Sequence, residues 1–331
     1  MIDIYGTLGP NCSDVKTLSA MFQAGMTGVR LNLSHATLRS SAQLIENLHA
    51  AAYENGITAQ LLIDMQGPEL RVGEIKDPLL LVEGAEVALG AGEIPVPPMI
   101  LPVLRKGQQV LLDDGKLLLE VREGSSVCAK AIVLRGGILK SRKSIALPGA
   151  SVYPPTMTEL DLQNIALAKG YGVTAVMQPF VRNRQDLETV RAALNKAGGG
   201  TIRLFAKIEN QEGIRNLDEL IKACDEIVIA RGDLGNAMPL WELPRVQKQI
   251  AASCRKAEKP FMVVTQMLSS MVNSPVPTRA EVSDIFNAVC DGAASVMGTG
   301  ETAVGKYPVE VIRYLANTVA EGLKFRENTD F

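Results

Sequence analysis

The chain has 331 residues, 47% of them hydrophobic, and its 34 basic and 36 acidic side chains give a net charge of −2. This length and composition allow a large buried core, divided into one large domain and a smaller insert, and exclude a single short helix bundle. The balanced charge argues against a general polyanion binder, so we expect no nucleic-acid partner.

Cysteine and histidine usage limits the covalent and metal chemistry of the chain. The five cysteines occur singly, which is typical of free thiols in a reducing compartment rather than of disulfides or a zinc site. Only two histidines are present, which excludes a histidine-rich metal centre. The first ten residues lack the basic segment of a signal peptide, and prolines interrupt the most apolar stretch, residues 94–104. We therefore expect a cytoplasmic protein without a membrane partner.

Strand-like apolar segments alternate with amphipathic helical segments, as in a parallel α/β fold. Eight such strands predict a closed (β/α)8 barrel, also called a TIM barrel. The predicted strands span residues 2–9, 28–34, 58–66, 172–180, 202–209, 226–234, 260–267 and 295–301.

A different pattern interrupts this alternation after the third strand. Residues 74–146 contain glycine, valine and short alternating runs, with the turn signal DDG at 113–115. We therefore predict a catalytic barrel formed by residues 1–73 and 147–331, and a small β-rich domain formed by residues 74–146. Since the loops that follow barrel strands lie at the active-site end, the inserted domain is placed to act as a lid.

Two predicted helices carry an N-terminal capping signal. Ser13 precedes the segment VKTLSAMFQAG, and Thr278 precedes RAEVSDIFNAVCDG. A Ser or Thr side chain at this position accepts a hydrogen bond from the first helical turn, so we expect both residues to be N-caps.

The stretch FAKIENQEG, residues 205–213, ends an apolar strand in two opposite charges, Lys207 and Glu209. Strand side chains alternate between faces, so these two point the same way while Ile208 points the other way. An ion pair at a strand end and a catalytic pair at the mouth of a barrel both fit this stretch when it is considered alone.

Other predicted strands also end in polar residues, and the carboxyl-terminal ends of barrel strands share one rim. Each residue alone is compatible with a structural polar group, but buried charges are costly unless they are paired or bind a ligand. Their convergence from six strands therefore predicts a binding or catalytic site. The residues are Arg30, Asn32, Ser34, Asp64, Lys207, Glu209, Arg231, Asp233, Thr265, Thr299 and Glu301.

The residue types at this rim indicate the chemistry. Glu209 and Asp233 supply hard oxygen ligands, which suit Mg²⁺ or Mn²⁺ rather than zinc. Lys207 and Arg30 supply two cations, which beside a divalent metal suit a phosphate-bearing anion. Transfer of such a phosphoryl group depends chiefly on positioning and charge stabilisation.

Short motifs spread along the chain resemble those of the pyruvate kinase family. They occur in the family's order through nearly the whole chain, which makes the resemblance far more specific than any single motif. The matching segments are GTLGP (6–10), VRLNLSH (29–35), DMQGPELRVG (64–73), DDG (113–115), ALPG (146–149), AKIENQEG (206–213), ARGDLG (230–235), TQMLSSM (265–271), PVPTRAEVSD (275–284) and GTGETAVGKYP (298–308).

The resemblance implies a barrel with an inserted lid domain and the transfer of phosphate from phosphoenolpyruvate to ADP, which gives pyruvate and ATP. Carried over by motif, Lys207 would stabilise the charge that passes between the phosphoryl group and the enolate, and Arg30 would bind the phosphate. Glu209 and Asp233 would hold the divalent metal. Thr265 would lie where the enolate is protonated, through water, because a hydroxyl is a poor acid by itself.

The resemblance also implies a K⁺ site and contacts to substrate and nucleotide. The substrate carboxylate would lie by the backbone amides of Arg231, Gly232 and Asp233, where a strand meets a helix N-terminus. Glu69 matches the acid found in K⁺-dependent members. The implied K⁺ ligands are the side chains of Asn32, Ser34 and Asp64 and the backbone carbonyl of Met65. The residues implied to contact the nucleotide are His35, Arg71, Lys143 and Asn32.

The chain departs from the family pattern near the third strand. The family motif D-T-K-G-P-E-I-R reads DMQGPELR here, so Met65 and Gln66 replace Thr and Lys, and Pro179 stands where the family has Ser. A backbone ligand at position 65 survives this change, whereas the Lys cation is lost. No segment matches the family's C-terminal domain, so we expect no regulation by sugar phosphates and, for any assembly, a homodimer through barrel contacts.

Three other functions remain open on this sequence. A Mg²⁺-dependent barrel lyase or aldolase would also use Glu and Asp from adjacent strands, but would need neither a nucleotide nor the predicted K⁺ ligands. A kinase that acts on another enol-phosphate is motivated by Met65, Gln66 and Pro179. A non-catalytic metabolite-binding homologue is motivated by the altered motifs and the unmatched C-terminal domain.

Overall fold

The computed structural model describes residues 2–34, 36–150 and 152–328. The chain divides into two compact units. The first comprises Met1–Gly67, Thr156–Leu234 and Glu242–Phe331, and the second comprises Pro68–Pro155 and Gly235–Trp241.

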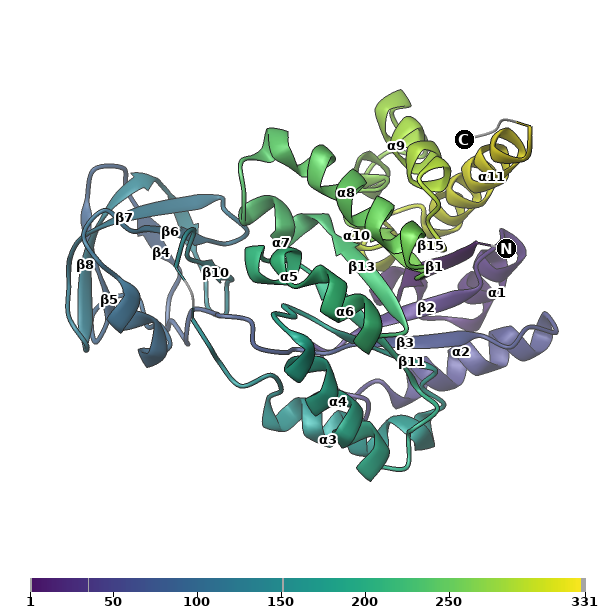
Figure 1. Ribbon diagram of the computed structural model, residues 1–331, viewed down its shortest axis with the longest axis horizontal. Coiled ribbons are helices and arrows are strands. Elements are labelled where there is room, and N and C mark those ends of the chain that lie inside the picture. The colour runs from purple at the N-terminus through teal and green to yellow at the C-terminus, as the bar shows by residue number, and fades with distance from the viewer. Residues whose placement is uncertain (1, 35, 151, 329–331) are drawn as a thin grey trace. The chain divides into compact units, whose positions relative to one another are not determined.

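The first unit is a closed barrel of parallel strands with helices on its outside (Figure 1). Neighbouring strands follow the order β1-β15-β14-β13-β12-β11-β3-β2. The predicted closed (β/α)8 barrel is therefore confirmed, and each predicted strand is found within its predicted range. The strands are β1 (Asp3–Thr7), β2 (Gly28–Asn32), β3 (Gln60–Asp64), β11 (Ala175–Gln178), β12 (Arg203–Ile208), β13 (Glu226–Ala230), β14 (Phe261–Val264) and β15 (Ser295–Gly298).

The barrel interior is filled by side chains, so it is a packed core rather than a channel. Every residue of β11, β13, β14 and β15 is buried, as expected for strands covered on both faces. The buried cluster inside the barrel is Tyr5, Leu62, Ala175, Met177, Phe205, Val228, Ala230, Met262, Val264 and Met297. A ligand of the barrel must therefore bind at one end of the strands.

Local side chains cap the start of several helices. Thr278 caps α9 (Arg279–Cys290) in a reciprocal capping box with Glu281, which confirms that prediction. The prediction for Ser13 is wrong, because Asp14 caps α1 (Val15–Gln23) and accepts a hydrogen bond from the amide of Thr17. The remaining α-helices are α2 (Ala42–Glu54), α3 (Glu159–Ala168), α4 (Arg184–Lys196), α5 (Gln211–Arg215), α6 (Leu217–Ala223), α7 (Arg231–Asn236), α8 (Leu243–Lys256), α10 (Gly300–Ala303) and α11 (Pro308–Glu327).

Ser13 fails as a cap because it is the C-cap residue that directly follows the short 3-10 turn Pro10–Cys12, and it adopts right-handed helical dihedrals. An N-cap needs an extended backbone, which Asp14 has.

In the part of the chain that the structure describes, no helix combines the length and apolar character that crossing a membrane requires.

The second unit is β-rich and has its own apolar core. A five-stranded sheet has the order β10-β6-β7-β8-β5, and β4 pairs with β9. The predicted turn at 113–115 joins β6 to β7, and all three of its residues have positive φ. The strands are β4 (Leu79–Leu81), β5 (Glu86–Gly90), β6 (Gln109–Leu112), β7 (Leu117–Gly124), β8 (Cys128–Arg135), β9 (Gly137–Leu139) and β10 (Ile145–Ala146).

Candidate active site

Strands β2, β3 and β12 bring buried charges together at the carboxyl-terminal end of the barrel. Arg30 of β2 donates from Nε and Nη2 to Oδ2 of Asp64, the last residue of β3, at 2.9 and 2.6 Å. Lys207 Nζ lies 3.3 Å from the same Asp64 oxygen and 3.0 Å from Oε1 of Glu209. The structure therefore joins Arg30, Asp64, Lys207 and Glu209 into one ion-pair network.

Strand geometry accounts for this network. The residues of β2 and β3 are in register, with Asn32 opposite Asp64, so Arg30 reaches Asp64 from two positions earlier on the same face. Lys207 is in β12. Glu209 directly follows the end of this strand, two positions after Lys207. The amide of Phe180, after β11, donates to Glu209 Oε2 at 2.8 Å and fixes the carboxylate.

Burial and charge set the ionisation of the network. Burial opposes the charge of Asp64, but Lys207 and then Arg30 outweigh it and hold the pKa of Asp64 below its usual range. Burial also opposes the charge of Lys207, but Asp64 and Glu209 raise the pKa of its ammonium group above the usual value. Lys207 is therefore a fixed cation and Asp64 a fixed carboxylate.

Glu209 differs from Asp64 because its charge is not fully compensated. It is 2% exposed, and this burial raises the pKa of its carboxyl group, an effect that Lys207 only partly offsets. The negative charge of Asp233, at the start of α7, raises the same pKa further. Of the five charged groups that act on one another here, three are acids and two are cations.

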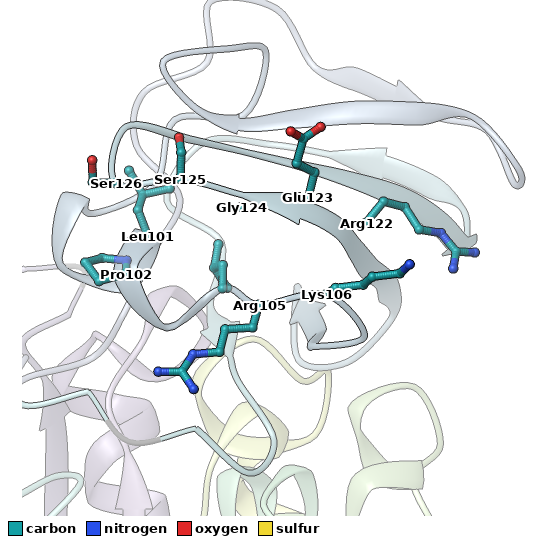
Figure 2. A pocket seen from close by; sticks show the side chains of 10 residues that line it. Leu101, Pro102, Arg105, Lys106, Arg122, Glu123, Gly124, Ser125 and Ser126 are labelled. Atoms are coloured by element: carbon teal, nitrogen blue, oxygen red, sulfur yellow. The ribbon is translucent and has the colours of Figure 1, made fainter.

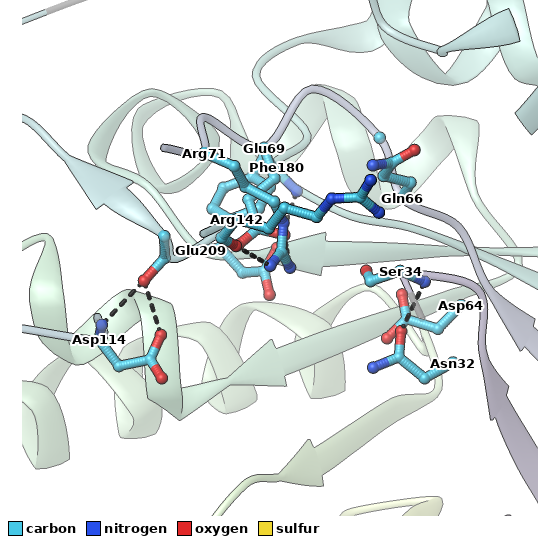
Figure 3. Close-up of polar contacts among 12 residues, drawn as sticks. Asn32, Ser34, Asp64, Gln66, Glu69, Arg71, Asp114, Arg142, Phe180 and Glu209 are labelled. Carbon is cyan, nitrogen blue, oxygen red and sulfur yellow. Dashed lines mark hydrogen bonds and ion pairs between the residues drawn. The ribbon is translucent and has the colours of Figure 1, made fainter. Parts of the chain in front are cut away.

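The residues implied to bind K⁺ lie around the end of β3. The side-chain oxygen of Asn32 accepts a hydrogen bond from the amide of Ser34 at 3.1 Å, close to Asp64 (Figure 3). The amide of Met65 donates to the carbonyl of Met177 at 3.1 Å. The Met65 side chain is buried, so the difference between Met and the family's Thr affects packing. The backbone carbonyl of residue 65, the implied K⁺ ligand, does not depend on the side chain.

A buried carboxylate fixes the backbone that follows Met65. Asp161 accepts hydrogen bonds from the amides of Gln66 and Gly67 at 2.9 and 3.0 Å. Gly67 has a φ of +59°, and a Cβ there would lie 2.4 Å from the ring of Pro179. Pro179 therefore packs against a glycine that has no room for a side chain.

Thr265 follows β14 with an unusual backbone. Its φ is +78°, and that of Gln266 is +56°, values that are rare for non-glycine residues and rarer for a β-branched one. A Cβ on Gly232 would lie 3.1 Å from the methyl group of Thr265 and 3.7 Å from its hydroxyl. The Thr265 side chain thus lies over the backbone of Gly232, one of the residues implied to bind the substrate carboxylate.

Two of the residues implied to contact the nucleotide belong to the second unit. Arg71 pairs with Glu69 at 2.5 Å and donates to the carbonyl of Arg142 at 2.8 Å (Figure 3). Lys143 pairs with Asp113 at 2.7 Å. Asn32 belongs to the barrel, and His35 lies outside the described residues.

The second unit also contains an open pocket of about 520 Å³. Arg105, Lys106 and Arg122 line it beside Glu123 (Figure 2). None of the residues predicted from the sequence as a site residue contributes to this pocket. Within the described residues, no three His, Cys, Asp or Glu side chains form a ready metal cage.

Sequence reasoning missed the acids that hold the rim in place. Asp161 fixes the backbone after β3, and Glu281 accepts from the amide and hydroxyl of Ser270 at 2.7 and 2.6 Å. Both acids are the third residue of a helix whose N-cap is Thr158 or Thr278. The pattern Thr-x-x-Asp/Glu could therefore have marked them in the sequence.

The fold and this rim define a (β/α)8 barrel protein whose strand ends carry a network of buried ion pairs. A family model described as "Pyruvate kinase, barrel domain" matches residues 1–312. The chain therefore belongs to the pyruvate kinase family.

Curated relatives agree with this membership. The pyruvate kinase of Geobacillus stearothermophilus is 37% identical over 321 residues, which cover 94% of this chain and 55% of that protein. Those of Aeropyrum pernix and Thermococcus litoralis are 36% and 37% identical, over 98% and 99% of this chain and 71% of each relative. The chain thus spans between about half and three quarters of the length of these relatives.

Proposed function

We propose that the protein transfers the phosphoryl group of phosphoenolpyruvate to ADP and releases pyruvate and ATP. The observation that carries this proposal is the buried network of Arg30, Asp64, Lys207 and Glu209 at the barrel rim of a chain in the pyruvate kinase family. Two fixed cations next to buried carboxylates suit an anion that arrives together with a divalent cation.

Glu209 and Asp233 fit the metal that this reaction requires. Their hard carboxylate oxygens suit Mg²⁺ or Mn²⁺, and burial raises the pKa of the Glu209 carboxyl group, an effect that a bound cation would oppose. Two protein carboxylates leave room for waters and substrate oxygens, which Mg²⁺ usually retains. A bound divalent ion would neutralise charge on the transferring phosphoryl group.

The reaction breaks the bond between phosphorus and the enol oxygen and forms a bond between phosphorus and a terminal oxygen of ADP. In our proposal, the ammonium group of Lys207 stabilises negative charge on the phosphoryl oxygens and then on the enolate oxygen. Arg30, in β2, binds the phosphate. The enolate then takes up a proton at its terminal carbon, through water held at the hydroxyl of Thr265.

The finer contacts are part of the same proposal. Asn32, Ser34, Asp64 and the carbonyl of Met65 bind K⁺, and the backbone amides from Arg231 to Asp233 bind the substrate carboxylate. His35, Arg71, Lys143 and Asn32 contact the nucleotide, and residues 74–146 act as the lid domain. A cytoplasmic location and a homodimer through barrel contacts complete the proposal.

A coupled assay tests this function. Pyruvate formation is followed with lactate dehydrogenase while phosphoenolpyruvate, ADP, Mg²⁺ and K⁺ are each omitted in turn. We expect turnover that needs phosphoenolpyruvate, ADP and Mg²⁺ and that increases with K⁺. Turnover without ADP would favour a lyase, and turnover with a different phosphorylated donor would favour another enol-phosphate. Binding of phosphoenolpyruvate and ADP without any turnover would favour the non-catalytic homologue.

A further inference from the structure

The strained backbone at Thr265 is held by hydrogen bonds from the side chain of Arg231. Arg231 Nε and Nη2 both donate to the carbonyl oxygen of Thr265, at 3.1 and 2.7 Å. The guanidinium group therefore fixes the peptide unit that follows Thr265. Since the nitrogens of the guanidinium group bind other protein atoms, only the backbone amide of Arg231 is left for the proposed role towards the substrate.

The remaining edge of the guanidinium group is held by Asp284. Nη1 of Arg231 donates to Oδ1 and Oδ2 of Asp284 at 2.8 and 2.6 Å. The arginine side chain is 12% exposed and the aspartate side chain 32%, so this ion pair is partly shielded from water. Asp284 therefore determines where the arginine donors lie.

Asp284 comes from a helix that already holds the same loop. Glu281 and Asp284 are three residues apart in α9, so they share one face of the helix. Glu281 binds Ser270 directly, and Asp284 reaches Thr265 through Arg231. A weaker contact at 3.4 Å joins the amide of Leu268 to Glu301 of α10.

Strain explains why so many side chains hold one short loop. Thr265 is β-branched and has a φ of +78°, a conformation that persists only where the surroundings enforce it. Without the hydrogen bonds to its carbonyl, the segment would relax towards extended dihedrals. The Thr265 hydroxyl would then leave its place above Gly232.

We propose that Asp284 is a positioning residue for the proposed phosphoryl-transfer reaction: through Arg231, it holds the strained Thr265 backbone so that the Thr265 hydroxyl lies at the protonation site of the enolate. This inference rests on the proposed function for its catalytic part. Asp284 itself contacts no reacting group in this scheme.

The first test compares Asp284→Asn with Asp291→Asn in the coupled assay. Asp291 is at the C-terminal end of the same helix and pairs with Lys248 at 2.6 Å, so this control removes the same charge without touching the loop. We expect Asp284→Asn to lower kcat roughly 10-fold and to change KM for phosphoenolpyruvate less than about 2-fold. Asp291→Asn should leave both unchanged, and Asp284→Glu should recover part of the loss.

A double-mutant cycle tests whether Asp284 acts through Thr265. In a Thr265→Ala background, Asp284→Asn should lower kcat by less than about 2-fold, because the group that it positions is already absent. Deuterium uptake into the methyl group of pyruvate, followed by NMR with Mg²⁺, K⁺ and ATP, should fall in Asp284→Asn by the same factor as kcat. Equal losses of kcat in both backgrounds, or an unchanged kcat in Asp284→Asn, would overturn the proposal.

A stability cycle separates this inference from the proposed function, because it needs no substrate. Glycine tolerates positive φ, so Thr265→Gly removes the strain that Arg231 and Asp284 oppose. We expect the loss of unfolding free energy caused by Asp284→Asn to be reduced by about half in the Thr265→Gly background. Equal losses in both backgrounds would reject the proposed hold on Thr265, whether or not the enzyme uses phosphoenolpyruvate. A wild-type protein that is inactive but shows the coupling would reject the proposed function alone.

Discussion

The two ends of the barrel accommodate buried acidic side chains in different ways. Each end has a buried glutamate whose pKa is raised by burial, Glu209 at the carboxyl-terminal end and Glu226 at the amino-terminal end. Glu209 belongs to a network with two cations and two further acids. Glu226 accepts a hydrogen bond from the hydroxyl of Ser295, and its nearest cation, Arg203, is 3.9 Å away.

At the amino-terminal end of the barrel, polar side chains form hydrogen bonds with one another. The Tyr5 hydroxyl donates to Gln60, Gln60 donates to Asp3 at 2.8 Å, and Arg203 donates to Tyr5 at 3.2 Å and to Gln60. Asp3, Gln60 and Arg203 are each the first residue of a barrel strand, and Tyr5 is the third residue of β1. Such an end contributes stability rather than chemistry.

The barrel separates stability from function by placing them at opposite ends of its strands. At the amino-terminal end, a buried carboxyl group lowers its energy by keeping a proton. At the carboxyl-terminal end, acids exceed cations, and a divalent ion together with a phosphorylated substrate would restore the balance. Substitutions at the two ends should therefore have opposite consequences.

The largest expected effect is on turnover at the carboxyl-terminal end. Lys207→Met removes the cation that stabilises the transferring group, so kcat should fall roughly 10³-fold. The coupled pyruvate assay measures this, with Lys248→Met, which breaks an exposed ion pair, as the control. A kcat of Lys207→Met within about 10-fold of the wild-type value would remove Lys207 from the chemistry.

The next effect is on stability at the amino-terminal end and depends on pH. Burial raises the pKa of Glu226 from 4.5 to about 7, with Arg203 and Ser295 opposing and Asp3 reinforcing the shift. Its contribution to stability is therefore full below pH 4.5 and is lost as pH rises through 7. One pKa unit corresponds to about 1.4 kcal/mol, so the total loss is about 3 kcal/mol.

Glu226→Gln removes this pH dependence because the amide does not ionise. Relative to the wild type, the variant should gain unfolding free energy between pH 5 and pH 8, by about 3 kcal/mol at most, with turnover unchanged. Denaturant titrations at both pH values measure the difference. A variant that is less stable at pH 8 than the wild type would show that the carboxylate form is the stabilising one.

The smallest of the three effects separates the two glutamates by their response to metal. Mg²⁺ at about 100 times its Kd should stabilise the wild type by about 2.7 kcal/mol. Glu209→Gln should abolish this increment, whereas Glu226→Gln, the same change at the other end, should keep it. Thermal unfolding with and without Mg²⁺ measures both. Equal Mg²⁺ stabilisation in the two variants would place the metal elsewhere.

The sequence predicts the barrel well because its strands are buried on both faces. Segments such as EIVIA in β13 and FMVV in β14 are apolar at nearly every position, and their spacing fits one strand and one helix per unit. The rim is predictable for a related reason. A buried charge such as that of Lys207 at the end of an apolar strand is costly unless it is paired or binds a ligand.

Other features depend on side chains that meet only in the folded chain. Nothing local to Asp64 indicates that it pairs with both Arg30 and Lys207, since these partners come from two other strands. The positive φ of Thr265 is equally invisible, because a β-branched residue is a poor candidate for that conformation. The Ser13 prediction is wrong because Ser13 ends the short 3-10 turn Pro10–Cys12 as its C-cap, a role that the local sequence does not indicate.

The most direct test of the central claim follows the phosphoryl group itself. Phosphorus NMR of the wild-type protein with phosphoenolpyruvate, ADP, Mg²⁺ and K⁺ should show the phosphoenolpyruvate signal decrease while the γ-phosphate signal of ATP increases by the same amount. Release of inorganic phosphate without ATP, or an unchanged spectrum from a folded protein that binds Mg²⁺, would contradict the account.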